Sequence, residues 1–345
     1  VYTAMHGVGR KLIETVLRGH GYDELTIVEE QGDPDPDFST VSFPNPEEPG
    51  AMDLALAYGQ RVHADLIIAN DPDADRLAVA VPSADGGFRA LTGNQVGTIL
   101  AHELLTYGEA KPGRLVATTI VSSAMLSVIA EHHKVDYAET LTGFKWLAQH
   151  SIARENSGGH FVMGFEEALG YSVGHVVRDK DGVSAALLFC DLAARCRSEG
   201  MTVLDRLAEI YSQYGVFASK QHALKLPGQA GKARIEEIMG QLRANLPTRI
   251  GQRDVRQIRD LQSGWATVLQ SGERHSIDLP KSNVLAFDLE DGGRILARPS
   301  GTEPKIKFYF EVCDQMDGDS LDVAEDRAQL KLAGLEADFL GSIGI

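Results

Sequence analysis

Three aspartates at alternate positions, Asp71, Asp73 and Asp75, are the residues whose type and spacing point most directly to chemistry. Apolar runs at residues 66–69 and 77–81 flank them, and both runs are typical of buried strands. The short loop therefore presents three carboxylates from a strand–loop–strand unit. Because carboxylates this close repel one another, a cation between them is the natural compensation. Oxygen ligands alone favour a hard ion, Mg²⁺ or Mn²⁺, over zinc.

Two other kinds of acidic loop fit these residues less well. An EF-hand needs glycine at the sixth and glutamate at the twelfth loop position, where this chain has Arg76 and Pro82. An aspartyl phosphatase of the haloacid-dehalogenase type needs threonine or valine at the fifth position, where this chain has Asp75. A solvated turn without an ion stays open, but a Mg²⁺ site is the preferred interpretation.

A second group of residues suited to chemistry lies near the C-terminus, between two apolar runs. Arg298, Ser300, Gly301 and Thr302 offer a guanidinium fork, two hydroxyls and a flexible backbone amide within five residues. Bidentate arginine together with hydroxyl and backbone donors is a common way to hold a phosphate. We therefore predict a phosphate-binding loop here, although a structural turn fits the same residues.

Acidic and basic side chains also gather in the middle of the chain. Glu166 and Glu167 follow an apolar run, and a carboxylate there can accept hydrogen bonds from sugar hydroxyls. A paired-carboxylate glycosidase is the competing interpretation, but no second, separated acid stands in a recognisable context. Four positively charged side chains of the same region are predicted to lie in loops that could meet a phosphate, although each alone fits a surface charge equally well: Lys145, His175, Arg178 and Lys180.

The composition excludes some classes of partner. The chain has 345 residues, with 33 Lys and Arg against 49 Asp and Glu, and a net charge of −16 argues against a nucleic-acid surface. An anionic substrate must therefore meet a local basic cluster. The longest apolar stretch, residues 183–194, contains Asp191 and is too short for a bilayer, so no membrane partner is expected. Three cysteines cannot all pair, which favours a reducing cytoplasm.

The predicted elements divide the chain into three units, expected at residues 1–110, 111–222 and 223–345. The first two are expected to be α/β domains with mixed sheets, and the third a smaller α+β domain. Strands are predicted at residues 25–29, 66–69, 77–81, 114–120, 135–140, 285–289, 294–297 and 306–312. Helices are predicted at residues 10–19, 52–62, 91–105, 122–132, 183–198, 203–214, 235–245 and 322–340, with Asp181 or a neighbour capping the helix at 183.

The Asp-Pro-Asp-Ala-Asp-Arg string at residues 71–76 resembles the metal loop of the α-D-phosphohexomutases, the phosphoglucomutase and phosphomannomutase superfamily. Residues 3–9 resemble the opening of that family's second domain. Residues 165–168 are similar to the sugar-binding loop of its third domain, and residues 298–302 to the phosphate loop of its fourth. The strings Phe-Glu-Glu-Ala-Leu-Gly-Tyr and Thr-Gly-Phe-Lys-Trp look most like the branch of phosphoglucomutase-2-like and phosphopentomutase enzymes.

This resemblance implies a reversible shift of phosphate between O1 and O6 of glucose or mannose, or O5 of a pentose. The reaction would pass through a phosphoserine and a sugar bisphosphate, with Mg²⁺ on the three aspartates. The side chains implied in catalysis are Arg76, Lys145 and His175. The residues implied in binding a sugar phosphate or bisphosphate are Glu166, Arg178, Lys180, Arg298, Ser300, Gly301 and Thr302.

Two departures from the family pattern change what is expected. Ala168 stands where the sugar loop usually has serine, which removes one contact to a sugar hydroxyl. The Ser-His-Asn-Pro segment of the family's first domain is absent, and Ser122 and Ser123 lie in a turn of the wrong unit. We therefore expect a chain that needs its own N-terminal domain as a partner, and that alone binds a hexose phosphate weakly without converting it. A non-catalytic phosphosugar-binding paralogue is the alternative.

Overall fold

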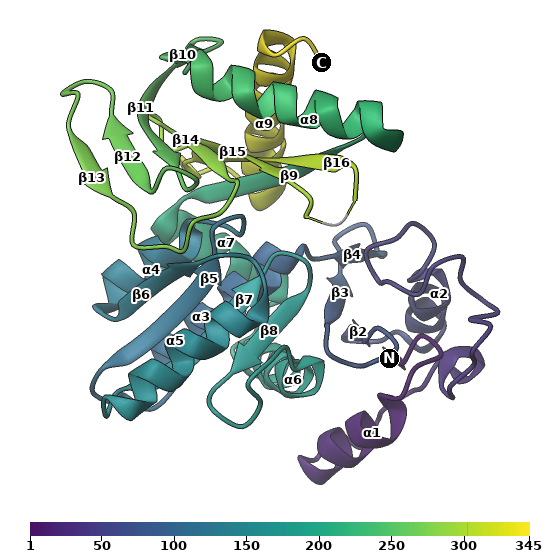
Figure 1. The fold of residues 1–345 in the computed structure, drawn as a ribbon. Coiled ribbons are helices and arrows are strands. Elements are labelled where there is room, and N and C mark those ends of the chain that lie inside the picture. The colour runs from purple at the N-terminus through teal and green to yellow at the C-terminus, as the bar shows by residue number, and fades with distance from the viewer. Residues whose placement is uncertain (302) are drawn as a thin grey trace. The chain divides into compact units, whose positions relative to one another are not determined.

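The computed structural model describes residues 1–301 and 303–345, which form two compact units, residues 1–210 and 211–345. Strands and helices alternate through the first unit, and a large antiparallel sheet with two long helices makes up the second (Figure 1). The α/β class with mixed sheets and a final α+β part, predicted from the sequence, is confirmed. The three predicted domain boundaries stay predictions.

The first sheet of unit 1 carries the aspartate loop. Its strand order is β1-β2-β3-β4, formed by Tyr2–Thr3, Ile67–Ala69, Ala78–Pro82 and Phe88–Ala90. β1 runs parallel to β2, whereas β2, β3 and β4 are antiparallel neighbours. Every residue of β2 is buried, and so is every residue of β3 before its last, as expected for the apolar runs that form them. Because β2 and β3 pair directly, the aspartates between them must lie together at one end of the sheet.

The second sheet of unit 1 carries the glutamate pair. Its order is β6-β5-β7-β8, formed by Asp136–Thr140, Arg114–Thr119, His160–Glu166 and Gly170–Val173. β5 is parallel to both of its neighbours, and β8 returns antiparallel to β7. The tight return from β7 to β8 is what holds the glutamate pair at this end of the sheet.

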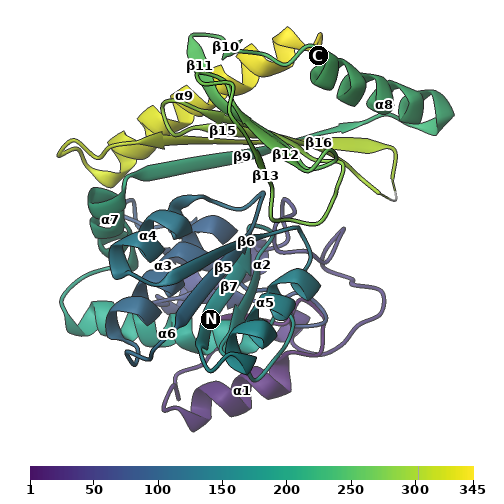
Figure 2. The same cartoon turned by 60° about the vertical axis from the view of Figure 1, so that its left-hand side comes forward.

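Helices cover both faces of this second sheet. An apolar cluster of Leu115, Ala117, Phe144, Leu147 and Phe161 joins α5 to β5 and β7, while α3 and α4 pack on the opposite face (Figure 2).

Side-chain caps begin two of the helices of unit 1. A capping box formed by Thr92 and Gln95 begins α3, and the carboxylate of Asp181 accepts from the Val183 N–H at the start of α6, as predicted. The helices of unit 1 are α1 Arg10–Gly19, α2 Asp53–Val62, α3 Gly93–Tyr107, α4 Met125–His133, α5 Phe144–Asn156 and α6 Gly182–Ser198, with a 3₁₀ turn at Glu29–Gln31.

Unit 2 is built on one antiparallel sheet that holds the predicted phosphate loop. The chain enters it from α7, Val203–Tyr214, whose residues lie on both sides of the boundary between the units. α8 and α9 cover one face of the sheet (Figures 1 and 2), and Phe339 of α9 packs against three sheet phenylalanines. The strands, in spatial order, are β13 Arg274–Ser276, β12 Trp265–Val268, β11 Arg253–Asp260, β14 Leu285–Leu289, β15 Arg294–Pro299, β16 Lys305–Asp314 and β9 Val216–Lys225, with β10 Arg249–Ile250 beside β11. The helices are α8 Gly228–Ala244 and α9 Leu321–Ser342.

Three predicted elements are wrong in type or extent. The helix predicted at residues 235–245 begins earlier, as α8 starts at Gly228. Residues 25–29 form no strand: only Ile27 bridges to Tyr2, and a 3₁₀ turn begins at Glu29, because β1 is too short to pair with a longer segment. The helix predicted from residue 122 begins at Met125. Ser122 and Ser123 instead form hydrogen bonds in the turn before it.

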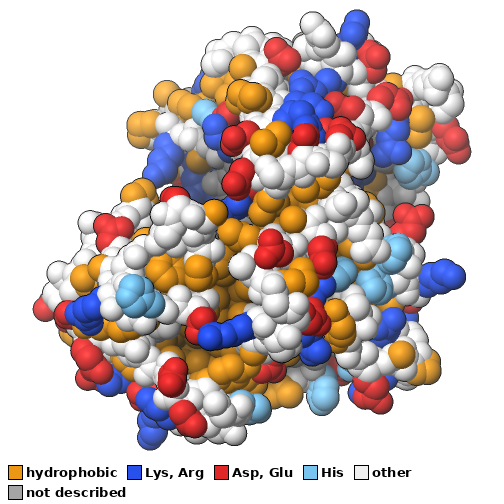
Figure 3. Space-filling view, turned by 180° about the vertical axis from the view of Figure 1, so that it is seen from behind, with side chains coloured by type: hydrophobic (Ala, Val, Ile, Leu, Met, Phe, Trp, Pro, Cys, Tyr) orange, Lys and Arg blue, Asp and Glu red, His pale blue; other side chains and the backbone are white. Residues whose placement is uncertain are grey.

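Charge is distributed rather than concentrated on the face shown in Figure 3. Acidic and basic side chains lie next to one another there, with apolar side chains between them. Within the described residues, no helix is both long and apolar enough to cross a membrane. The three cysteines are free thiols, and Cys190 and Cys196 are buried.

A buried histidine gives unit 1 a predicted sensitivity to acid. His102 of α3 is 8% exposed, and its ring lies 5.9 Å from the ring of His133 in α4. Burial, together with the nearby positive groups His133, Arg206 and His132, lowers the pKa of His102 to about 4. The unfolded chain binds this proton near its ordinary pKa of about 6.5, so acid favours unfolding between these two values.

We therefore expect the free energy of unfolding of unit 1 to fall by about 2–3 kcal/mol from this one group between about pH 7 and about pH 4.5. Urea titrations at the two pH values measure it. His102→Gln should lose clearly less stability on acidification than the wild type, whereas replacing the exposed His150 by glutamine should not change the difference. Equal acid losses in the wild type and His102→Gln would contradict this assignment.

Candidate metal centre and phosphate loop

The loop between β2 and β3 brings the three aspartates together. Asp71, Asp73 and Asp75 each offer a carboxylate oxygen, and these oxygens all lie within 4.8 Å of one another. Asp71 is buried, Asp73 is exposed and Asp75 is half-buried. The site is therefore open to solvent on one side and closed on the other, which suits an ion that enters from water.

Hydrogen bonds from behind fix the shape of this loop. The Arg76 N–H donates to Asp71 Oδ1 at 3.0 Å, and the fully buried Asn70 donates from Nδ2 to the Arg76 carbonyl at 2.5 Å. Ala74 has a positive φ of 59°, which lets the loop turn between the second and third aspartates. A Cβ on Gly182, at the start of α6, would lie 2.2 Å from the Arg76 carbonyl oxygen, so this position requires glycine. Asn70 and Gly182 therefore support the loop, and neither role was identified from the sequence.

The electrostatics of the loop fit a bound cation. Burial, together with the neighbouring carboxylates of Asp73 and Asp75, raises the pKa of Asp71 to about 6. Asp75 Oδ1 is buried and accepts no hydrogen bond from any residue that the structure describes. A cation would reduce the repulsion among the three carboxylates by neutralising their charge. It would also supply the partner that Asp75 Oδ1 lacks among the described residues. An all-oxygen set of this kind suits a hard divalent ion.

Two basic side chains border the aspartates. Arg76 Nε lies 3.5 Å from Asp71 Oδ2, and Lys180 Nζ lies 2.6 Å from Asp75 Oδ2. Lys180 belongs to the connection between β8 and α6, far from the loop in sequence. The structure thus brings Lys180 to the metal loop, a placement that its position in the sequence did not indicate.

The glutamate turn is joined to the aspartate loop by main-chain pairing. Arg76 forms an isolated antiparallel bridge with Gly170, and the Leu77 N–H donates to the Leu169 carbonyl at 3.0 Å. Glu166 ends β7, and its Oε1 accepts from the Gly143 N–H at 2.5 Å. The two predicted acidic sites therefore lie next to each other within unit 1.

Glu167 has a structural role in this turn. The buried Ser122 Oγ donates to Glu167 Oε2 at 2.8 Å and accepts from the Glu167 N–H at 3.0 Å. A Cβ on Gly93 would meet the Glu167 carbonyl oxygen at 2.0 Å, so α3 packs directly on the turn. Of the glutamate pair, Glu167 is thus tied to the scaffold through a serine that the sequence placed only in a turn.

The remaining basic residues predicted in unit 1 lie in different settings. Lys145 is in the first turn of α5, not in a loop as predicted, and its amine lies 5.1 Å from the centre of the Trp146 ring. Arg178 donates to Ser151 at 2.6 Å and pairs with Glu155 on α5. His175 is exposed in the connection that follows β8. Of the four predicted positive groups of this region, Lys180 is the one that contacts an aspartate of the loop.

The predicted phosphate loop joins β15 to β16 in unit 2. Arg298 lies in β15 opposite Lys307 and is half-buried, and its guanidinium forms no hydrogen bond or ion pair within residues 1–301 and 303–345. The Ser300 N–H donates to the Lys305 carbonyl at 2.8 Å, which closes the turn. Gly301 is exposed at its tip, and the predicted Thr302 lies outside the described residues. A guanidinium that has no partner among the described residues and lies beside an exposed turn can bind an anion.

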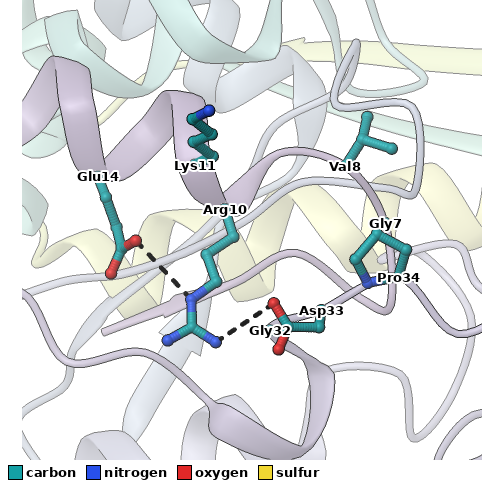
Figure 4. A pocket seen from close by; sticks show the side chains of 8 residues that line it. All are labelled: Gly7, Val8, Arg10, Lys11, Glu14, Gly32, Asp33 and Pro34. Carbon is teal, nitrogen blue, oxygen red and sulfur yellow. Dashed lines mark ion pairs between the residues drawn. The ribbon is translucent and has the colours of Figure 1, made fainter.

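A pocket of about 340 Å³ lies at the start of α1. Its lining includes Arg10 and Lys11 together with Glu14 and Asp33 (Figure 4). Figure 4 shows the guanidinium of Arg10 between Glu14 and Asp33. The same guanidinium also pairs with Glu29 at 3.0 Å. Because its arginine is already neutralised by carboxylates, we do not place a phosphate here.

Comparison with known proteins identifies the family. Three sequence models of the phosphoglucomutase/phosphomannomutase family match consecutive parts of the chain: alpha/beta/alpha domain II at residues 1–86, alpha/beta/alpha domain III at residues 92–214, and the C-terminal domain at residues 232–328. A protein of Haemophilus influenzae named "Probable phosphomannomutase" is 43% identical over 312 residues, which is 90% of this chain and 59% of that protein. A phosphoglucomutase of Staphylococcus epidermidis is 36% identical over 318 residues, covering 92% of this chain and 58% of its own length.

Solved structures of this family share the fold. Parafusin, a phosphoglucomutase from Paramecium crystallised in an open form, superposes with a TM-score of 0.65 at 20% identity, over 99% of this chain and 57% of that one. This chain thus spans a little under three fifths of the length of the relatives named here. On its sequence relatives and its matched domains, the chain belongs to the α-D-phosphohexomutase superfamily, the isomerases that include phosphoglucomutase and phosphomannomutase.

Proposed function

We propose that these residues form the metal-, sugar- and phosphate-binding part of a phosphohexose mutase that interconverts the 1- and 6-phosphates of glucose or mannose. One observation carries the proposal: the aspartate loop, which can hold a metal ion, is paired through Arg76 and Gly170 with the glutamate turn. The names of the relatives support the reaction class. We propose domains at residues 1–110, 111–222 and 223–345, and a cytoplasmic location.

In this proposal the three aspartates hold Mg²⁺. Asp71, Asp73 and Asp75 supply oxygen ligands from one short loop, and Asn70 keeps that loop in shape from behind. When bound, the ion would offset negative charge on a transferring phosphoryl group. Arg76 adds a positive charge at the same edge of the loop, where the resemblance places the phosphoserine.

The substrate is proposed to be held by groups of two kinds. Glu166 accepts hydrogen bonds from sugar hydroxyls, and its place at the end of β7 is fixed by the Gly143 N–H. The basic groups Lys145, His175, Arg178 and Lys180 serve the reacting end of the sugar. The phosphate that does not react is bound by the loop of unit 2, through Arg298, Ser300, Gly301 and Thr302. One loop serves both orientations if the sugar turns over as a bisphosphate between the two transfers.

Binding to a panel of sugars tests the recognition part of this function. In the presence of Mg²⁺ we expect titration calorimetry to show binding of glucose 1-phosphate and mannose 1-phosphate, and no measurable binding of glucose. Ribose 1-phosphate tests the pentose alternative. A chain that binds glucose and glucose 1-phosphate equally well would not be a phosphosugar site.

The reaction itself is tested on a protein that carries these residues together with the Ser-His-Asn-Pro segment expected from the resemblance. With Mg²⁺ and a catalytic amount of glucose 1,6-bisphosphate, glucose 1-phosphate should be converted to glucose 6-phosphate. Binding without conversion in that protein would instead support the non-catalytic paralogue.

A further inference from the structure

Lys180 is the nearest cation to the third aspartate of the loop. Its ammonium lies 2.6 Å from Asp75 Oδ2 and 3.8 Å from Asp179 Oδ1. The side chains of Lys180 and Asp75 are only 23% and 27% exposed, so this contact is partly shielded from water. A lysine from a distant segment therefore neutralises part of the charge of the three aspartates.

The path of the lysine side chain is set by packing. A Cβ on Gly170 would lie 2.6 Å from Lys180 Cδ and 2.7 Å from the Phe144 ring. The aliphatic part of the Lys180 side chain therefore packs directly on the backbone of Gly170, which a larger residue would prevent. The ammonium lies 5.6 Å from the centre of the Phe144 ring. These contacts direct Lys180 toward the aspartate loop. The pair with Asp75 is therefore held by packing and is not a chance contact on the surface.

We propose that Lys180 is an internal counter-ion of the aspartate loop, displaced from Asp75 when a divalent cation binds and thereby released to an anionic phosphate group. This inference rests on the proposed function, because it requires the aspartate loop to be a metal site. A divalent ion among the three carboxylates and an ammonium on one of them repel each other. Metal entry is therefore expected to weaken the pair, and an unpaired lysine at the edge of the site can then attract phosphate.

The opposite role is also physically possible and makes the opposite prediction. If Lys180 only orients Asp75 for the ion, its removal should weaken metal binding, as losses of such supporting hydrogen bonds usually do. If it competes with the ion, its removal should strengthen binding. The sign of the change in Mg²⁺ affinity decides between the two roles.

Titration calorimetry of Mg²⁺ at fixed, low ionic strength provides the measurement. Lys180→Met should bind Mg²⁺ on the order of three- to tenfold more tightly than the wild type, because a competing, partly shielded ion pair is gone. Lys180→Gln should also bind more tightly, since it lacks the charge, whereas Lys180→Arg should stay within about twofold of the wild type. Lys111→Met removes an equal charge at an exposed pair with Glu109 and should leave the affinity unchanged.

A second readout needs no substitution. An amine-acylating reagent, followed by peptide mass spectrometry, should modify Lys180 faster when Mg²⁺ saturates the wild-type chain, relative to Lys111 in the same sample. Unchanged or weaker Mg²⁺ binding by Lys180→Met, or Lys180 acylation that does not rise with Mg²⁺, overturns the counter-ion role while leaving the metal site in place. A wild-type chain that binds no Mg²⁺ would instead overturn the proposed site itself.

Discussion

Replacing Asp73 by asparagine is expected to weaken Mg²⁺ binding by on the order of tenfold or more, because a small hard ion loses one of three anionic ligands. Asp73 is the best of the three for this test. It is exposed, whereas Asp71 is buried and accepts the Arg76 N–H that shapes the loop. A loss of affinity in Asp73→Asn therefore reports on the ion rather than on folding.

Calorimetric titration with Mg²⁺ measures this effect, and thermal unfolding of the same samples shows whether the fold is intact. Asp65→Asn is the matched control: it makes the same chemical change in unit 1 at an exposed side chain that pairs with Arg197. We expect the control to bind Mg²⁺ like the wild type. Equal binding by Asp73→Asn and the wild type would exclude Asp73 as a ligand.

The elements that the sequence predicted best are those with a strong local pattern. The predicted limits of α1, α7 and β14 agree with the structure, because amphipathic periodicity or a buried apolar run defines each of them. The aspartate cluster was also visible, since acids at alternate positions between two antiparallel strands must lie close together. These features depend on neighbours in the sequence.

The strands of unit 2 between residues 249 and 276 were not predicted. β13 is exposed at all three of its residues, and β11 alternates charged side chains with its few buried ones, so neither contains an apolar run. Their conformation comes from pairing with β12 and β14, which the local pattern does not contain. The strand predicted at residues 25–29 was wrong for the opposite reason. The apolar composition of these residues suits a strand, but their partner strand, β1, is only two residues long.

The same distinction applies to the site. Residue types and a family resemblance identified the aspartates and the glutamate pair, but not what holds them. Asn70 behind the loop, Gly182 against the Arg76 carbonyl and Ser122 on Glu167 act through contacts between residues far apart in the chain.

Arg298→Ala is expected to weaken the binding of glucose 1-phosphate by about tenfold or more. A guanidinium that holds phosphate through two charge-assisted hydrogen bonds contributes about 1.5–3 kcal/mol, and about 1.4 kcal/mol corresponds to a factor of ten in Kd. Arg298 is suited to this task because its guanidinium has no hydrogen bond or ion pair to any other residue in the described part of the chain. Its loss should therefore leave the fold of unit 2 intact.

Two further variants separate the geometry of the guanidinium from its charge. Arg298→Lys keeps the charge but not the planar fork, so its affinity for glucose 1-phosphate should fall between those of the wild type and Arg298→Ala. Arg256→Ala removes an exposed arginine from β11 of the same unit and should bind like the wild type, which controls for net charge. Calorimetry with glucose 1-phosphate and with glucose compares the ligands. If Arg298→Ala leaves glucose 1-phosphate binding unchanged, or if Arg256→Ala weakens it equally, the loop between β15 and β16 does not hold the phosphate.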